Sequence, residues 1–215
     1  MKLLSRQPAE FVARPTMGTP RSQDTVHLTE ILHYISGKLG WYGREVDDPE
    51  VNFDNDPVMQ LKAGMGFAWE EYLARTHPEW EFHSGEVELD GIVGSPDATS
   101  EDALVVEEIK LSYYSTKLDA NFLQEGRVIS VHDLGLDTKR PVWKYRAWQL
   151  MSYCWMVGTV YGRWWLLSVN GDYTDKKPVF ENLLVEFTPE ELAANWEMVI
   201  ANRDAMLGER EKNNG

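Results

Sequence analysis

Cysteine is nearly absent from this chain of 215 residues, and Cys154 is the only one. A single cysteine excludes an internal disulfide and any metal or iron–sulfur site that needs four cysteine ligands. Cys154 stands between Tyr153 and Trp155 in a helical pattern of apolar residues. This position favours a buried core thiol over a catalytic nucleophile.

Long apolar runs are also absent, since no stretch approaches the roughly 18 residues of a membrane span. Residues 1–14 carry charges and a proline where a secretory signal needs an unbroken apolar core. Hydrophobic residues make up 43% of the chain and charged residues 26%, which is typical of a globular protein. We therefore expect a cytoplasmic protein with no membrane partner.

Basic residues are scarce: 21 Lys and Arg stand against 35 Asp and Glu, for a formal charge of −14. Phosphate contacts need Lys and Arg, so this balance argues against a general nucleic-acid coat and fits an acidic interaction protein equally well. One segment departs from it, because residues 139–146 contain four basic side chains and no acid: Lys139, Arg140, Lys144 and Arg146. These four residues predict either a local basic strip that binds nucleic acid or the solvated start of a helix.

The chain length suits one domain, which we expect over residues 25–207, after an irregular arm at 1–24 and before a polar tail at 208–215. Hydrophobic spacing predicts helices over 25–39, 58–75, 141–157 and 188–207, and strands over 86–93, 104–109, 161–170 and 179–187. In the second helix one apolar stripe is expected to be core: Val58, Leu61, Met65, Trp69, Tyr72 and Leu73.

The stretch Gly94–Lys110 concentrates the residues that can do chemistry. Its second half, from Leu104, is an apolar run that becomes acidic and ends in lysine, as a buried strand delivering charge to its own end would. Residues at i and i+2 share a strand face, so Glu108 and Lys110 point the same way while Ile109 points into the core. If the two halves of this stretch pair as a hairpin through a loop at 99–102, Asp97 comes level with Glu108 and Lys110.

Two carboxylates and an ammonium at one point suit metal-dependent phosphodiester hydrolysis. Asp97, Glu108 and the Ile109 carbonyl offer the oxygen ligands that a hard cation such as Mg²⁺ takes. Lys110 beside the metal could orient or deprotonate the attacking water. Two other acidic residues are alternative candidates for the metal ligands. Asp90 precedes Gly91 and is better explained as a turn residue, and Glu107 falls on the strand face opposite Lys110.

These residues resemble the motif of the PD-(D/E)XK nuclease superfamily, matched by Pro96-Asp97 and by Glu108-Ile109-Lys110. Gln149 and Tyr153, one helical turn apart on one face, resemble the Q-x-x-x-Y motif of its RecB-like and lambda-exonuclease-like branch. Gly66 and Glu70 resemble the G-x-x-x-E helix of that branch, whose acid reaches toward the metal. The resemblance covers residues 58–165.

The resemblance implies a restriction-endonuclease-like α/β fold, with a mixed central β-sheet flanked by helices. It implies Mg²⁺- or Mn²⁺-dependent cleavage of DNA, with one or two ions, most simply by an exonuclease of phage recombination or repair acting on duplex with a free end in the host cytoplasm. Glu70 would support the metal shell, and Gln149 and Tyr153 would hold the scissile strand or the lysine. Iron–sulfur relatives are excluded by the cysteine count. Some phage relatives are ring-shaped trimers, so a homo-oligomer is compatible with this reading.

Substrate contacts are expected along two segments of the chain. Lys117, with nearby tyrosines, could line the path of the nucleic acid, since tyrosines stack on bases and lysines contact phosphates. The basic strip at 139–146 would form the entrance to the site. The alternatives are an endonuclease of the same superfamily and a catalytically inactive nuclease fold that binds DNA or protein.

Overall fold

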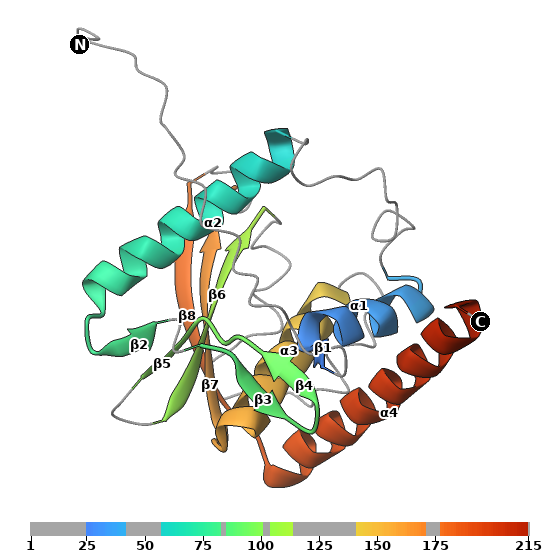
Figure 1. The fold of residues 1–215 in the computed structure, drawn as a ribbon. Helices are drawn as coiled ribbons and strands as arrows, with labels where there is room; N and C mark the ends of the chain where they lie inside the picture. The colour runs from blue at the N-terminus through green and yellow to red at the C-terminus, as the bar shows by residue number, and fades with distance from the viewer. Residues whose placement is uncertain are drawn as a thin grey trace, which may run out of the picture.

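A computed structural model describes residues 25–41, 57–82, 85–100, 104–113, 141–170 and 177–214. The elements in chain order are β1 (Val26–His27), α1 (Leu28–Lys38), α2 (Pro57–Thr76), β2 (Trp80–Phe82), β3 (Val87–Leu89), β4 (Ile92–Gly94), β5 (Ala98–Ser100), β6 (Val105–Ser112), α3 (Pro141–Val157), β7 (Tyr161–Ser168), β8 (Val179–Glu186) and α4 (Pro189–Asn214) (Figure 1). The expected arm at 1–24 and the predicted DNA contacts Lys117, Lys139 and Arg140 lie outside the described residues.

Two mixed sheets organise these elements. The larger has the order β2-β5-β6-β7-β8, in which β6 and β7 run parallel and the other neighbours antiparallel. The smaller has the order β1-β4-β3, with β1 parallel to β4. Helix α2 crosses one face of the larger sheet, while α1, α3 and α4 gather on the other side (Figure 1). The α/β fold with mixed sheet and flanking helices is thus confirmed.

The hydrophobic core divides between the two faces of the larger sheet. The larger cluster joins β6 and β7 to α1, α3 and α4, with Val106, Trp164 and Leu150 among its buried members. The smaller cluster lies on the opposite face, and consists of Leu73, Trp80, Ala98, Ile109 and Trp165. Central strands covered on both faces need apolar residues on both, and β6 supplies Val106 to the larger cluster and Ile109 to the smaller one.

Helix α4 is longer than its sequence pattern predicts. It begins as expected, because Thr188 Oγ1 accepts from the Glu191 amide at 3.1 Å and Glu191 Oε2 accepts from the Thr188 amide at 2.9 Å, a capping box. Its end at Asn214 corrects the expected end near residue 207. Ion pairs to α1 support the extra turns: Arg210 with Glu30 and Lys38 with Glu209, both at 3.1 Å. Among the described helices, none combines the length and apolar character that crossing a bilayer requires.

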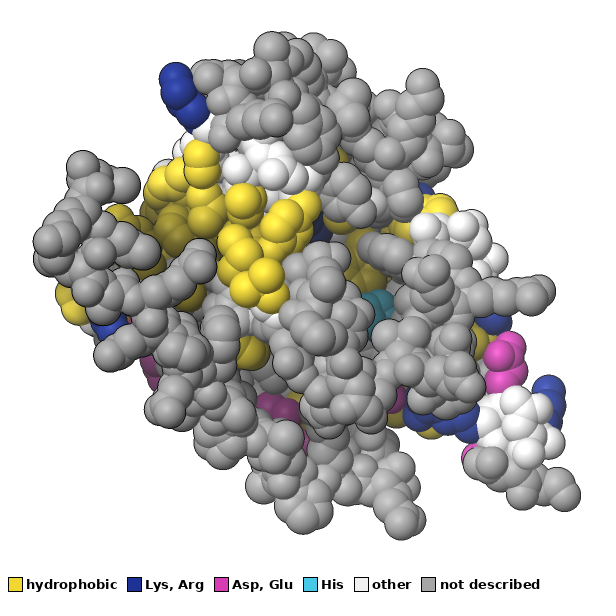
Figure 2. Space-filling model, turned by 90° about the horizontal axis from the view of Figure 1, so that it is seen from above, with side chains coloured by type: hydrophobic (Ala, Val, Ile, Leu, Met, Phe, Trp, Pro, Cys, Tyr) yellow, Lys and Arg dark blue, Asp and Glu magenta, His cyan; other side chains and the backbone are white. Residues whose placement is uncertain are grey.

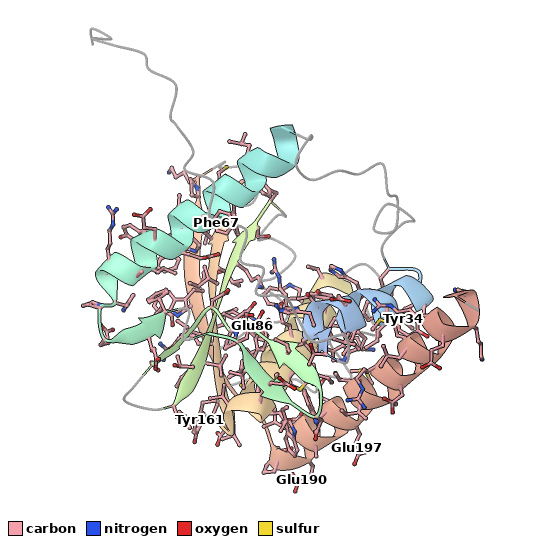
Figure 3. All side chains as sticks on the ribbon, in the orientation of Figure 1. Tyr34, Phe67, Glu86, Tyr161, Glu190 and Glu197 are labelled. Carbon is pink, nitrogen blue, oxygen red and sulfur yellow. The ribbon has the colours of Figure 1, made fainter. Side chains whose placement is uncertain are left out.

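The apolar stripe predicted for α2 is confirmed in part: Leu73 is buried and Trp69 packs against the smaller core cluster, but two other members are exposed. Leu73 is 1% exposed, whereas Leu61 is 54% and Tyr72 55% exposed. Helix α2 packs against β6, so a narrow strip of the helix is covered, and Leu61 and Tyr72 lie outside that strip. Phe67, labelled on α2 in Figure 3, is also exposed. Figure 2, which looks down on the top of Figure 1, shows apolar side chains gathered on that surface.

The strand expected over residues 86–93 is instead the hairpin of β3 and β4. Asp90 and Gly91 form its turn with φ angles of 53° and 74°, the left-handed pair that a tight hairpin needs. The turn role of Asp90 is therefore confirmed, and its Oδ2 also accepts from Trp196 Nε1 at 2.9 Å.

The β5–β6 connection begins later than the expected 99–102 loop. Leu104 belongs to this connection and is not a buried strand residue, because its side chain is 50% exposed and its φ angle is 46°.

Candidate active site

The register of β5 against β6 brings Asp97 to the charged end of the motif. Ala98 pairs with Glu107 in this antiparallel ladder, so the preceding residue, Asp97, lies level with Glu108. Asp97 Oδ2 accepts a hydrogen bond from the Ile109 amide at 2.7 Å. The half-buried carboxylate is thus fixed to β6 by the backbone, and the convergence expected from the sequence is present.

Strand alternation places Glu108 and Lys110 on one face of β6 and Ile109 on the other. Glu108 is 1% exposed, and its Oε1 accepts from Lys110 Nζ. Ile109 belongs to the smaller core cluster on the α2 side. One carboxylate from the start of β5 and a carboxylate–ammonium pair from β6 therefore meet at one partly closed point.

The pKa of Glu108 is raised from its ordinary value of 4.5 to about 8. Burial is the main cause, followed by the charge of Asp97, and Glu70 adds to the effect while Lys110 opposes it. Glu108 Oε2 is buried and has no hydrogen-bond partner among the described residues. Glu108 is therefore a buried acid that faces two other acidic side chains, and the Lys110 ammonium bonds only one of its two oxygen atoms.

Lys110 remains an ammonium at neutral pH despite its surroundings. Burial by itself would lower its pKa, but the carboxylates of Glu108 and Asp97 raise it, and the net direction is upward. Arg146 opposes this rise with its own positive charge. The lysine is therefore a hydrogen-bond donor rather than a free base in this arrangement.

The two carboxylates of the site are suitable ligands for a hard divalent cation. Asp97 and Glu108 supply oxygen atoms, and the orphaned Glu108 Oε2 lacks the partner that a cation would provide. The described residues contain no group of three or more His, Cys, Asp or Glu side chains placed to hold a metal. Glu70, half-buried on α2, acts on Glu108 through its charge. A Cβ added at Gly66, one turn earlier, would meet no atom within 4 Å.

Gln149 and Tyr153 form a buried polar pair on α3. Gln149 Nε2 donates to the Tyr153 hydroxyl at 3.3 Å, and the two side chains are 7% and 2% exposed. Burial raises the pKa of Tyr153 well above its ordinary range, and the negative charge of Glu108 raises it further. The phenol of Tyr153 is thus neutral and can donate a hydrogen bond, and its pKa depends on the charge of Glu108.

The two described residues of the basic strip take different positions. Lys144 Nζ lies over two aromatic rings, 5.4 Å from the Trp41 centroid and 5.3 Å from that of Trp148. Arg146 is only 7% exposed, with its guanidinium 4.9 Å from the Trp143 ring centroid. Arg146 also acts electrostatically on Lys110, so it lies closer to the carboxylates than a solvated strip would.

Cys154 is the buried thiol that the sequence predicts. Its Sγ donates to the Tyr161 carbonyl at 3.4 Å, and the side chain is fully buried. Burial, with a smaller contribution from the charge of Glu108, raises its pKa to about 12. A thiol held in this protonated state does not serve as a nucleophile.

Sequence reasoning identified the face of Glu107 but not its partners. This carboxylate is fully buried on the face opposite Glu108, and it accepts from Arg163 Nη1 at 3.2 Å and Trp165 Nε1 at 2.8 Å. Both donors lie on β7, where Arg163 stands in register with Glu107. The parallel pairing of β6 with β7 across a long connection carries no local sequence signal, so the partners were not predictable.

Comparisons with known proteins bear on the fold. No protein-family model matches the chain, and a search of curated proteins found no match. Among solved structures, LHK-Exo in complex with dAMP is 14% identical, covering 88% of this chain and 91% of its own, with a TM-score of 0.51. The alkaline exonuclease LHK-Exo from Laribacter hongkongensis (13%, 89% and 92%, TM-score 0.49) and a phage related exonuclease from Haemophilus somnus 129PT (12%, 85% and 83%, TM-score 0.48) also match. This chain therefore has the fold seen in the LHK-Exo complex.

Proposed function

We propose that this protein is a divalent-metal-dependent deoxyribonuclease that degrades DNA from a free end. The observation that carries the proposal is the meeting of Asp97, Glu108 and Lys110 at one point, with Glu108 Oε2 buried and unpartnered within the described residues. A protein that only binds a partner has no need for an ammonium beside two carboxylates.

The residues present would hold Mg²⁺ or Mn²⁺, as one or two ions. Asp97, Glu108 and the Ile109 carbonyl are the proposed ligands, and Glu70 adds negative charge from α2. When bound, such a cation supplies Lewis-acid polarisation of the phosphate and lowers the pKa of a bound water. The two carboxylates also counter the burial of Lys110, which keeps its ammonium in place.

Three polar side chains would act on the substrate itself. Lys110, held by Glu108, would donate a hydrogen bond to the attacking water or to a phosphate oxygen and so fix its position. Gln149 and Tyr153 would hold the scissile strand, because the neutral Tyr153 hydroxyl can donate to a phosphate oxygen while Gln149 fixes its direction. A neutral donor is preferable here, since a phenolate would repel phosphate.

Charge distribution supports a substrate that enters by its end. A chain of formal charge −14 repels duplex DNA over most of its surface, so productive binding is confined to a small basic region. The proposed entrance consists of Lys139, Arg140 and Lys144, with Lys117 on the path and the buried Arg146 at its inner end, near Lys110. The fold shared with LHK-Exo, an exonuclease that binds dAMP in its crystal, agrees with this mode of action.

The test incubates the protein with linear duplex and closed circular plasmid of one sequence, in Mn²⁺ or in EDTA. Progressive loss of the linear form alone, only with metal, is expected. Asp97→Asn and Glu108→Gln should abolish it, while Glu197→Gln, an exposed acid on α4 (Figure 3), should behave as wild type. Nicking of the circle at the same rate would mean an endonuclease, and no cleavage of either DNA in Mn²⁺ would leave a nuclease fold used for binding.

A further inference from the structure

Gly94, the last residue of β4, touches α3 at the proposed site. A Cβ built on Gly94 would lie 2.9 Å from Tyr153 Cε1 and 2.9 Å from Met156 Sδ. Both distances are shorter than carbon or sulfur atoms tolerate without moving. The φ angle of Gly94 is not among the positive values of the chain, so an alanine is compatible with the backbone there. The glycine is required for space, not for conformation.

The two neighbours differ in how easily they can yield. Met156 touches Gly94 through the end of a flexible, half-buried side chain, which can move at little cost. Tyr153 meets it with the edge of a stiff ring that is 2% exposed and enclosed by the larger core cluster. A side chain at position 94 would therefore displace the Tyr153 ring, and with it the hydroxyl that Gln149 holds.

We propose that Gly94 is a positioning residue that sets where the Tyr153 hydroxyl stands, a role that rests on the proposed nuclease function. Gly94 also stands three positions before Asp97, so one contact ties the turn that carries a proposed metal ligand to the helix that carries a proposed substrate donor. Because Gly94 has no Cβ, the two segments can approach closely, and this approach sets the distance between the turn that carries Asp97 and the part of α3 that carries Tyr153.

A second glycine provides a matched control. Gly162 on β7 also faces α3, and a Cβ there would lie 2.7 to 2.9 Å from three side-chain atoms of Leu150. Leu150 is fully buried and belongs to the core, outside the proposed machinery. Gly94→Ala and Gly162→Ala therefore introduce similar steric strain against one helix, but only the first acts on Tyr153.

Steady-state kinetics of DNA degradation should separate positioning from stability. Gly94→Ala is expected to lower kcat by about 10²-fold, the cost of a misplacement of roughly 1 Å, and Gly162→Ala to keep kcat per folded molecule. In a Tyr153→Phe background, Gly94→Ala should change kcat by less than about 3-fold, because the hydroxyl it displaces is gone. Equal losses in both backgrounds, or equal losses in the two glycine variants, would overturn the proposal.

A readout without activity distinguishes a failure of this inference from a failure of the nuclease assignment. In protein labelled with 3-fluorotyrosine, the ¹⁹F resonance lost in Tyr153→Phe identifies Tyr153. Gly94→Ala should shift that resonance and Gly162→Ala should not; an unshifted resonance in Gly94→Ala refutes the proposal whether or not the protein cleaves DNA. If Gly94→Ala does not fold, Gly94→Ala/Met156→Ala removes the Met156 contact and keeps the Tyr153 contact for the same measurement.

Discussion

Replacing Glu108 with glutamine tests the electrostatics of the site most directly. The side chain is 1% exposed, so glutamine keeps the shape of the buried group and removes only its ionisation. The pKa of Glu108 is about 8 in the folded protein against an ordinary 4.5. Over that interval the folded protein holds a proton that the unfolded chain has released, and this difference makes stability depend on pH.

The sign and size of the dependence follow from proton linkage. Below pH 4.5 both states carry the proton and the full stability is present; between 4.5 and about 8 only the folded state keeps it. Each pH unit in that range therefore lowers the free energy of unfolding by about 1.4 kcal/mol. The total loss on passing through the folded pKa is up to about 5 kcal/mol at 1.36 kcal/mol per unit of pKa difference.

The measurement is urea unfolding of the metal-free protein, followed by tryptophan fluorescence between about pH 5 and about pH 9. Wild-type stability should fall across this range, and the Glu108→Gln curve should be flatter, so that the variant becomes the more stable protein near pH 9. Glu197→Gln, an exposed change, should follow wild type. Mn²⁺ should stabilise the wild type more at high pH, because it competes with the proton. Parallel curves for wild type and Glu108→Gln would refute the electrostatic account.

Three further outcomes are expected. Lys110→Ala should leave the Mn²⁺-induced rise in Tm largely in place, since lysine is no ligand, yet slow DNA cleavage by roughly 10²- to 10⁴-fold; joint loss of metal affinity and rate would mean that it organises the carboxylates. Removing Gln149 and Tyr153 together should be little worse than the poorer single variant in kcat/KM, because they act as one hydrogen-bonded unit; additive losses would separate their roles. By chemical denaturation, Leu73→Ala should cost about 2–5 kcal/mol and Leu61→Ala under about 0.5 kcal/mol; equal costs would contradict their different burial on α2.

Local sequence determined much of the framework of the proposed site. The alternation of a strand is enough to place Glu108 and Lys110 on one face, because successive side chains point to opposite sides. The helical spacing of Gln149 and Tyr153 similarly puts them one turn apart on α3. Pairing of the two halves of the motif as a hairpin is sufficient to predict that Asp97 comes level with Glu108. Each of these relations joins residues no more than 12 positions apart in the chain, and each is present in the structure.

Tertiary structure decided what surrounds those residues. The raised pKa of Glu108 depends on the loss of water and on Asp97 and Glu70 arriving from other elements. The burial of Arg146 depends on the packing around α3, and the exposure of Leu61 depends on how little of α2 the sheet covers. Periodicity shows that a helix has an apolar face, but the width of the face that is buried is set by partners distant in sequence. Desolvation and long-range contact are properties of the assembled fold, and no short stretch of the chain encodes them.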